Sequence, residues 1–84
     1  SLSELVQDAL HAAQQHRLDG DFYSYYRELT RVAEWIAADD VKLLANLRAR
    51  TQAVGYGGAR PTEDELNGDQ RAIERVIARW KEQG

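Results

Sequence analysis

The chain has 84 residues, 43% of them hydrophobic and 30% charged, a composition that is ordinary for a globular domain with one modest core. It contains no cysteine, so neither a disulfide nor a thiolate metal site can reinforce that core. A net charge of -3 argues against general affinity for nucleic acid, and no apolar run approaches the length of a membrane span. We therefore expect no nucleic-acid partner and no direct membrane insertion.

The first segment has the pattern of an amphipathic helix. Its apolar residues recur at three- and four-residue spacing, and they are Leu2, Leu5, Val6, Ala9, Leu10 and Ala13. Ser1 and Glu4 have the spacing of a capping box, with Ser3 as a rival cap. Gly20 supplies the left-handed residue that commonly follows a helix. The pattern predicts a helix over residues 3–18.

The second segment combines aromatic and β-branched residues, which would also suit a strand. Its apolar positions follow the helical period of 3.6, however, and the segment is longer than an average strand. These positions are Phe22, Tyr25, Tyr26, Leu29, Val32, Ala33 and Ile36. Asp21 can cap this segment at its start, and Asp39 and Asp40 follow its end. The pattern predicts a helix over residues 22–37.

The same two aspartates can cap a third helix. Its expected apolar face consists of Val41, Leu44, Leu47 and Val54, with Leu43 beside them. Arg48 and Arg50 lie near its C-terminus, where positive charge complements the helix dipole. This pattern predicts a helix that runs up to the glycine-rich loop.

A fourth helix is predicted from Thr62 onward. Thr62 and Glu65 form a second capping-box pattern, and Pro61 precedes it. The apolar positions are Leu66, Ile73, Val76, Ile77 and Trp80. Gly68 either costs about 1 kcal/mol relative to alanine within this helix or breaks it after Asn67.

Four helices with short connections and no strand pattern predict an all-α fold, a small four-helix bundle. We expect residues 1–84 to form a single helical domain. The chain contains no methionine and begins at Ser1, so we also expect it to be a fragment of a longer protein.

The loop VGYGGARPTEDE, residues 54–65, holds three of the six glycines and the only proline. Such glycines can expose backbone N–H groups to an anion. This loop, however, lacks the lysine–serine/threonine ending of a phosphate-binding loop and does not follow a strand. Three acidic residues open the following helix and would repel a phosphate. We therefore interpret the loop as a hinge, on which Tyr56 and Arg60 are available to a partner.

Catalytic and metal-binding patterns are weak. His11 and His16 are five residues apart and do not share a helical face. Asp8 and His11 do share one, like half of a di-iron bundle motif, but the second half is missing. No serine or threonine has an evident histidine and orienting acid. We expect no cofactor, no metal and no enzymatic activity.

Two sets of side chains are candidates for binding a partner protein. Tyr23 and Trp35 lie away from the centre of the apolar stripe, and exposed aromatic residues are common in protein contacts. Arg71, Arg75 and Arg79 recur every four residues and therefore line one side of the fourth helix. Because glutamates are interleaved with these arginines, we interpret this side as a solvated face or as a contact for an acidic partner.

Three stretches, GDFYSYYRELTRVAEWI, LLANLRARTQAVGYGGARPTEDE and RAIERVIARW, are similar to the C-terminal region of the bacterial oxygen-tolerance (BatD) family. The family often has a turn with tyrosine and glycine, a proline and an acidic helix start. The matching residues here are Tyr56, Gly57, Gly58, Pro61, Thr62 and Glu65. Family members are encoded beside AAA+ ATPases and von Willebrand A-type proteins and are thought to be membrane-tethered assembly or stress-tolerance factors. The resemblance implies a non-enzymatic domain at the cytoplasmic face of a membrane; without it, we expect a cytoplasmic location.

These observations favour a protein-interaction or adaptor module within a larger bacterial protein, which the resemblance implies is membrane-anchored. An alternative is a small regulatory helical domain that senses an anion or cofactor near Tyr56 and Arg60. A third is a catalytic fragment whose remaining groups lie elsewhere in the parent chain.

Overall fold

The computed structural model describes residues 1–84, which fold into four α-helices without a strand. The helices are α1 (Leu2–Leu18), α2 (Phe22–Ile36), α3 (Val41–Gly55) and α4 (Glu63–Gln83). The predicted all-α four-helix bundle is therefore confirmed, with helix bounds close to those expected. None of the four helices is both long and apolar enough to cross a membrane.

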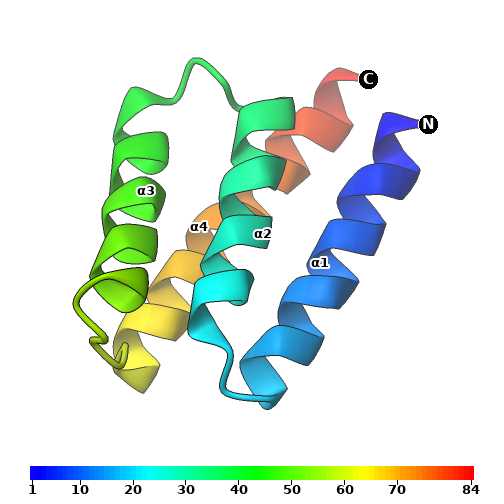
Figure 1. Ribbon diagram of the computed structural model, residues 1–84. Helices are drawn as coiled ribbons and strands as arrows, with labels where there is room; N and C mark the ends of the chain where they lie inside the picture. Colours follow the sequence, from blue (N-terminus) through cyan, green and yellow to red (C-terminus); the bar gives the residue numbers. More distant parts are fainter.

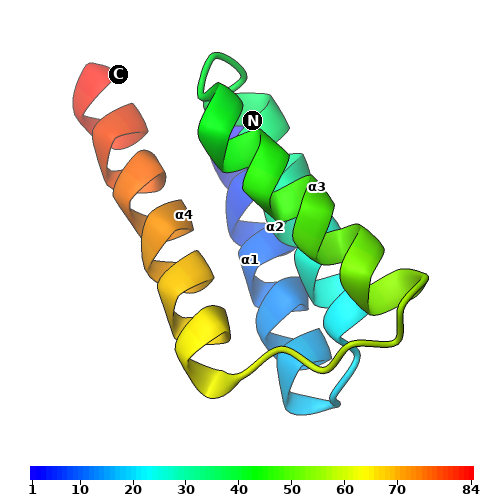
Figure 2. The same cartoon turned by 90° about the vertical axis from the view of Figure 1, so that its left-hand side faces the viewer.

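The helices are arranged in two layers. In Figure 1, α1, α2 and α3 lie side by side, with α2 in the middle and α4 behind it. The view turned by 90° shows α4 standing apart from the layer of the other three helices (Figure 2). The two chain termini lie at the same end of the molecule (Figure 1). This arrangement leaves one side of α2 open to solvent, between α1 and α3.

Each helix begins at the predicted residue or, for α1, one residue earlier, because a side chain accepts a hydrogen bond from a backbone N–H of the first turn. The capping residues are Ser1, Asp21, Asp40 and Thr62. Ser1 with Glu4 and Thr62 with Glu65 form complete capping boxes, so Ser1 rather than Ser3 caps α1. Gly20 adopts a φ of 75° and ends the turn between α1 and α2.

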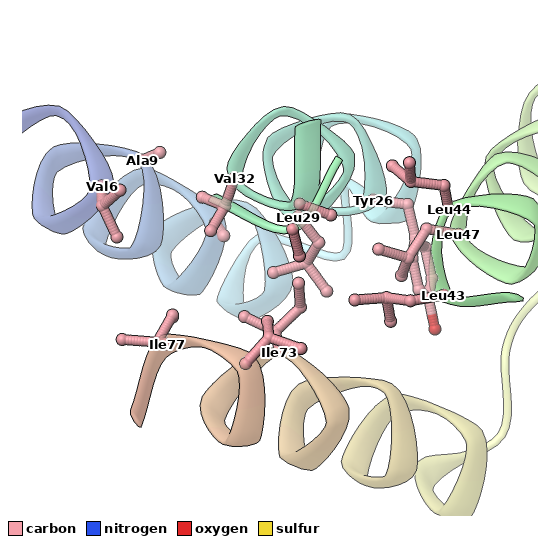
Figure 3. Close-up of a cluster of buried hydrophobic side chains, with 14 of the residues drawn as sticks. Val6, Ala9, Tyr26, Leu29, Val32, Leu43, Leu44, Leu47, Ile73 and Ile77 are labelled. Carbon is pink, nitrogen blue, oxygen red and sulfur yellow. The ribbon is translucent and has the colours of Figure 1, made fainter. Parts of the chain in front are cut away.

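The core is one cluster of 16 buried residues drawn from all four helices and the turn after α2. Figure 3 shows side chains of α1 and α2, such as Val6 and Leu29, on one side of the cluster and Ile73 and Ile77 of α4 facing them. α2 contributes Tyr26, Val32 and Ala33, each with none of its surface exposed. The middle helix is therefore the one most completely surrounded.

Three residues expected on apolar faces are exposed. Leu2 is 38% exposed, Leu5 51% and Val41 74%. All three lie in the first turn of a helix, near an end of the bundle. The apolar period indicates which face of a helix is buried, but it does not show how far the neighbouring helices extend. Leu43, expected only beside the apolar face of α3, is buried with Leu44 and Leu47.

Gly68 does not break the fourth helix. α4 continues without interruption from Glu63 to Gln83, and a Cβ placed on Gly68 would meet nothing within 4 Å. The residues that follow Gly68 anchor the helix, since Asp69 and Gln70 accept hydrogen bonds from other helices. Tertiary contacts therefore override the weak helix propensity of glycine.

Candidate protein-interaction surface

The open side of α2 has a regular ladder of side chains. Tyr23, Arg27, Arg31 and Trp35 are each four positions apart, and we call them the α2 ladder. Four residues turn an α-helix through about 400°, so successive members lie one turn apart and shift by about 40° around the axis. Tyr23, Arg27 and Arg31 are exposed, whereas Trp35 is half-buried. The ladder crosses the open side of α2 from one end to the other.

Each arginine of the ladder lies over an aromatic ring of the ladder. The guanidinium carbon of Arg27 is 5.8 Å from the ring centre of Tyr23, and that of Arg31 is 5.4 Å from the ring of Trp35. Arg27 also donates a hydrogen bond of 3.4 Å to the Tyr23 hydroxyl, which raises the pKa of Arg27 above its ordinary value. Such contacts hold the guanidinium planes in place and leave N–H groups free to donate elsewhere.

α3 provides the second wall of a groove. It runs antiparallel to α2, so its C-terminal end lies beside the start of α2 (Figure 1). The space between the two helices, which we call the α2–α3 groove, has a volume of about 400 Å³. It is lined by Tyr23, Arg27, Thr30, Arg31, Glu34, Arg48, Thr51, Gln52 and Tyr56. A Cβ on Gly55 would lie 2.7 Å from a ring carbon of Tyr23, so the close approach at this end of the groove depends on glycine.

Arginines provide the polar chemistry of the α2–α3 groove. Arg48 is paired with Glu34 and Arg31 with Glu28, each at 3.0 Å, whereas Arg27 forms no ion pair. The hydroxyls of the two threonines donate to carbonyl oxygens one turn earlier in their own helices, at 2.7 Å. The lining contains three arginines and one glutamate, and Glu28 pairs with Arg31 from outside the lining. Arg27 is therefore the arginine that gives the groove an uncompensated positive charge, on a chain of net charge -3.

Two of the predicted partner-binding residues meet in this groove. Tyr23 lies in the first turn of α2, and Tyr56 directly follows the last residue of α3. Both tyrosines line the α2–α3 groove. Tyr56 is 92% exposed, the most exposed of the large hydrophobic side chains. Trp35 lies outside the groove lining and packs in part against the core. The expectation of an exposed Trp35 is therefore only partly met.

The glycine-rich loop connects α3 to α4, and its first residues fold back onto the end of α3. Gly58 adopts a φ of 63°, and the N–H groups of Gly57 and Ala59 both donate to the carbonyl of Ala53, at 3.1 and 3.2 Å. These N–H groups are consequently engaged in ending α3. Arg60 is exposed, with its guanidinium 5.2 Å from the ring of Phe22, and it does not line the α2–α3 groove.

The three arginines of α4 form a separate surface. Arg71, Arg75 and Arg79 are exposed and belong to the second layer of the bundle, away from the open side of α2 (Figure 2). Arg79 lies 4.0 Å from a carboxylate oxygen of Asp40, whereas the other two form no ion pair. The predicted partner-binding residues therefore do not make up one continuous patch.

Three arginines of the groove lining, Arg27, Arg31 and Arg48, are not among the residues predicted to bind a partner. The first two could have been found from their regular spacing with the aromatic residues, because positions 23, 27, 31 and 35 must lie along one helical side. No local pattern could have placed Arg48 opposite them, since its position across the groove depends on how α3 packs against α2.

A buried cluster of polar side chains links α2 and α3, which form the groove, to α4. Asp69 is only 6% exposed and accepts hydrogen bonds from Tyr26 (2.7 Å), Arg50 (2.9 Å) and Asn46 (3.1 Å). Burial, together with the hydrogen bond to Asp69, raises the pKa of the Tyr26 hydroxyl. The cluster joins α2, α3 and α4, and it fixes the relative positions of the two helices that form the groove.

No protein-family model, curated protein or solved structure matches this chain. The resemblance to the oxygen-tolerance family therefore stays a prediction. No group of three or more histidines, cysteines or acidic residues is arranged to hold a metal ion. Function is accordingly inferred from the chemistry of the surface itself.

Proposed function

We propose that this chain is a non-catalytic protein-interaction module that binds its partner through the α2–α3 groove and the α2 ladder, three members of which line that groove. The observation that supports it is the gathering of two exposed tyrosines and three arginines along one interhelical groove. Tyrosine and arginine are enriched among the residues that contribute most to protein interfaces.

The energetics of such a surface are favourable for binding. Tyrosine presents a large apolar area with few rotatable bonds, and an arginine held over a ring loses less freedom on binding than a free one. Tyr23 and Arg27 form such a pair inside the groove. A groove between two helices can receive a peptide segment, and the mostly polar lining of this one favours polar and charged side chains in that segment.

The proposal extends to the parent protein. The module would serve as an adaptor within a larger bacterial protein, and the resemblance to the oxygen-tolerance family would place that protein at the cytoplasmic face of a membrane. A parent sequence with an apolar segment of about 20 residues before this module would support the membrane tether. A parent sequence without such a segment would contradict the membrane tether but would not affect the proposed protein interaction.

Selection from a random peptide library followed by NMR tests the proposed surface. Selected peptides should shift the backbone amide signals of Arg27, Gln52 and Tyr56 in the ¹⁵N-labelled chain. Tyr56→Ser should weaken binding by about three- to tenfold, because a large interface aromatic is lost. Lys81→Ser on α4, which belongs to neither set of predicted partner-binding residues, is the control and should leave binding unchanged. Peptides that shift only α4 would contradict the assignment of the surface.

The ligand-sensing alternative makes a different prediction. A domain that senses an anion near the loop should melt at a higher temperature in the presence of phosphate or a nucleotide, because a ligand that binds the folded state stabilises it. Arg60→Ala should abolish that increase. This result, together with no peptide binding at the α2–α3 groove, would replace the interaction proposal.

A further inference from the structure

We infer that the occupant of the α2–α3 groove is an acidic peptide segment of another protein, with carboxylates that bind Arg27 and Arg48 and an apolar or aromatic side chain that contacts Tyr23 and Tyr56. This inference rests on the proposed function and adds the chemistry of the partner. The observation that supports the inference is that arginines and two tyrosines line the same groove, although the net charge of the chain is -3.

Charge complementarity is the first argument. Arg27 is exposed and forms no ion pair, so its only polar contact in the structure is the long hydrogen bond to the Tyr23 hydroxyl. A guanidinium group has five N–H donors in a fixed fork that matches a carboxylate. Arg27 therefore presents a solvent-exposed cation without an acidic partner in the groove lining.

The existing ion pairs leave the other arginines available. Arg48 uses its Nη2 for Glu34, and Arg31 uses its Nη1 for Glu28. The Arg48–Glu34 pair is exposed on both sides, and exposed pairs contribute little to stability, so a partner carboxylate can join or replace it at small cost. In the Arg31–Glu28 pair the Glu28 side chain is only 16% exposed, so a partner carboxylate would join this pair through the remaining N–H groups of Arg31 and not replace it.

The distribution of charge favours a peptide over a nucleic acid. Glu34 lies in the groove lining and Glu28 is paired with Arg31. A nucleic acid carries a negative charge at every nucleotide and would bring some of them against these glutamates. A peptide can place a neutral or basic residue there and keep its carboxylates for Arg27 and Arg48.

Defined peptides test the inference by calorimetry and NMR. The probe is a short glutamate-rich peptide with one central tyrosine, compared with analogues in which every glutamate is replaced by glutamine or by lysine. A single-stranded oligothymidylate of similar length is the fourth probe. The acidic peptide should bind at least about tenfold more tightly than either analogue, and its affinity should fall as salt is added.

Charge-matched variants locate the binding site. Arg27→Gln with Arg48→Gln should weaken binding of the acidic peptide about tenfold or more, because two charge-assisted hydrogen-bonding groups are lost. Lys42→Gln with Lys81→Gln removes the same charge at exposed positions outside the groove lining and should leave the affinity unchanged. All four side chains are exposed, so circular dichroism should show the same helical content in both variants.

The remaining outcomes separate this inference from the proposed function. Equal weakening by the two double variants would show unspecific charge attraction and overturn the inference, as would tighter binding of the oligothymidylate than of the acidic peptide. If library-selected peptides occupy the groove but are neutral or basic, the proposed function stands and only the acidic partner is wrong. If no peptide shifts the groove residues, both are wrong.

Discussion

Asp69 is the one charged side chain in the core, and its burial needs a compensating set of donors. A carboxylate removed from water is costly unless it is paired and hydrogen-bonded. Asp69 receives hydrogen bonds from Tyr26 of α2 and from Asn46 and Arg50 of α3. The residue therefore links three helices rather than merely favouring the dipole of its own helix.

Tyr25 and Tyr26 are neighbours with opposite polar environments, which gives a matched pair of variants. The Tyr26 hydroxyl donates to Asp69 at 2.7 Å, whereas the Tyr25 hydroxyl is buried without a hydrogen bond. Tyr26→Phe should lower the free energy of unfolding by about 1–3 kcal/mol, because Asp69 loses a donor. Tyr25→Phe should leave it unchanged or raise it, because it removes an unsatisfied polar group. Urea unfolding followed by circular dichroism measures both.

Equal losses in the two variants would contradict this account. They would show that the hydroxyls act through packing volume and not through hydrogen bonding. Burial raises the pKa of the Tyr25 hydroxyl, and the nearby Arg17 only partly offsets that rise. A neutral, unpaired hydroxyl is the state that Tyr25→Phe removes.

At the scale of the helix, Gly68 is a position where helical propensity can be improved. It lies inside α4 with open space around a future Cβ. Gly68→Ala should therefore raise the free energy of unfolding by about 0.5–1 kcal/mol, mainly by reducing the freedom of the unfolded chain. Gly20→Ala is the contrasting variant and should lower it, because Gly20 has a φ of 75° that alanine rarely adopts. Thermal unfolding of both variants checks the prediction, and a lower melting temperature for Gly68→Ala would contradict it.

The capping box of α4 makes part of the stability depend on pH. Hydrogen bonds from Thr62, with a smaller effect of Arg50, hold the pKa of Glu65 below its ordinary value of 4.5. The folded state thus has the lower pKa, so this contribution is present above that ordinary value and is lost as the pH falls through the folded pKa. Asp21 behaves in the same way, because hydrogen bonds from Ser24 lower its pKa from 3.8.

The melting temperature should therefore decrease between about pH 5 and pH 3. Thr62→Ala removes the hydroxyl that accepts a hydrogen bond from the Glu65 N–H and that helps to lower the pKa of Glu65, whereas the backbone N–H of residue 62 still donates to the Glu65 carboxylate. The variant should therefore lower the melting temperature at neutral pH and make the acid-induced decrease smaller. Ser3→Ala is the control, since Ser1 and not Ser3 caps α1. An acid-induced decrease of the same size in Thr62→Ala would show that other carboxylates dominate.

At the scale of the whole molecule, polar contacts hold α4 mainly through its N-terminal half. Arg17 of α1 donates to Gln70, Asn67 and Glu63 at 2.8 to 3.0 Å, and Arg50 of α3 donates to Asp69 and Glu65. The C-terminal half borders a cleft of about 480 Å³ between Trp80 and the turn after α2. The polar contact that crosses to α4 at this end is Arg79–Asp40, at 4.0 Å.

This asymmetry predicts unequal local stability along α4. Native-state hydrogen exchange should be faster at the amides of Trp80–Gln83 than at those of Leu66–Ile73, because the last turns have fewer buried contacts. Arg17→Ala should accelerate exchange mainly around Asn67 and Gln70. Uniform exchange along α4 would mean that the helix opens only with the whole bundle.

Local chemistry by itself determined the helices and their ends. A helical period of apolar residues and a capping side chain act within a few positions of one another, so they are visible in the sequence. The capping boxes at Ser1 and Thr62 and the left-handed glycine at position 20 were all predicted and are present. The all-α fold follows from the sum of these local preferences.

Tertiary packing decided which side chains share a surface. Tyr23 and Tyr56 meet because α2 and α3 are antiparallel neighbours, and Arg48 joins them from a position that no local spacing relates to α2. The hydrogen-bond donors to Asp69 lie on two other helices, so the sequence of α4 does not reveal them. The burial of Asp69 does have a local indication, because the residue lies in the apolar stripe of α4 between Leu66 and Ile73. A contact between residues far apart in the chain produces no periodic pattern in the sequence. The α2–α3 groove is formed by such contacts between α2 and α3, so only the tertiary structure reveals it.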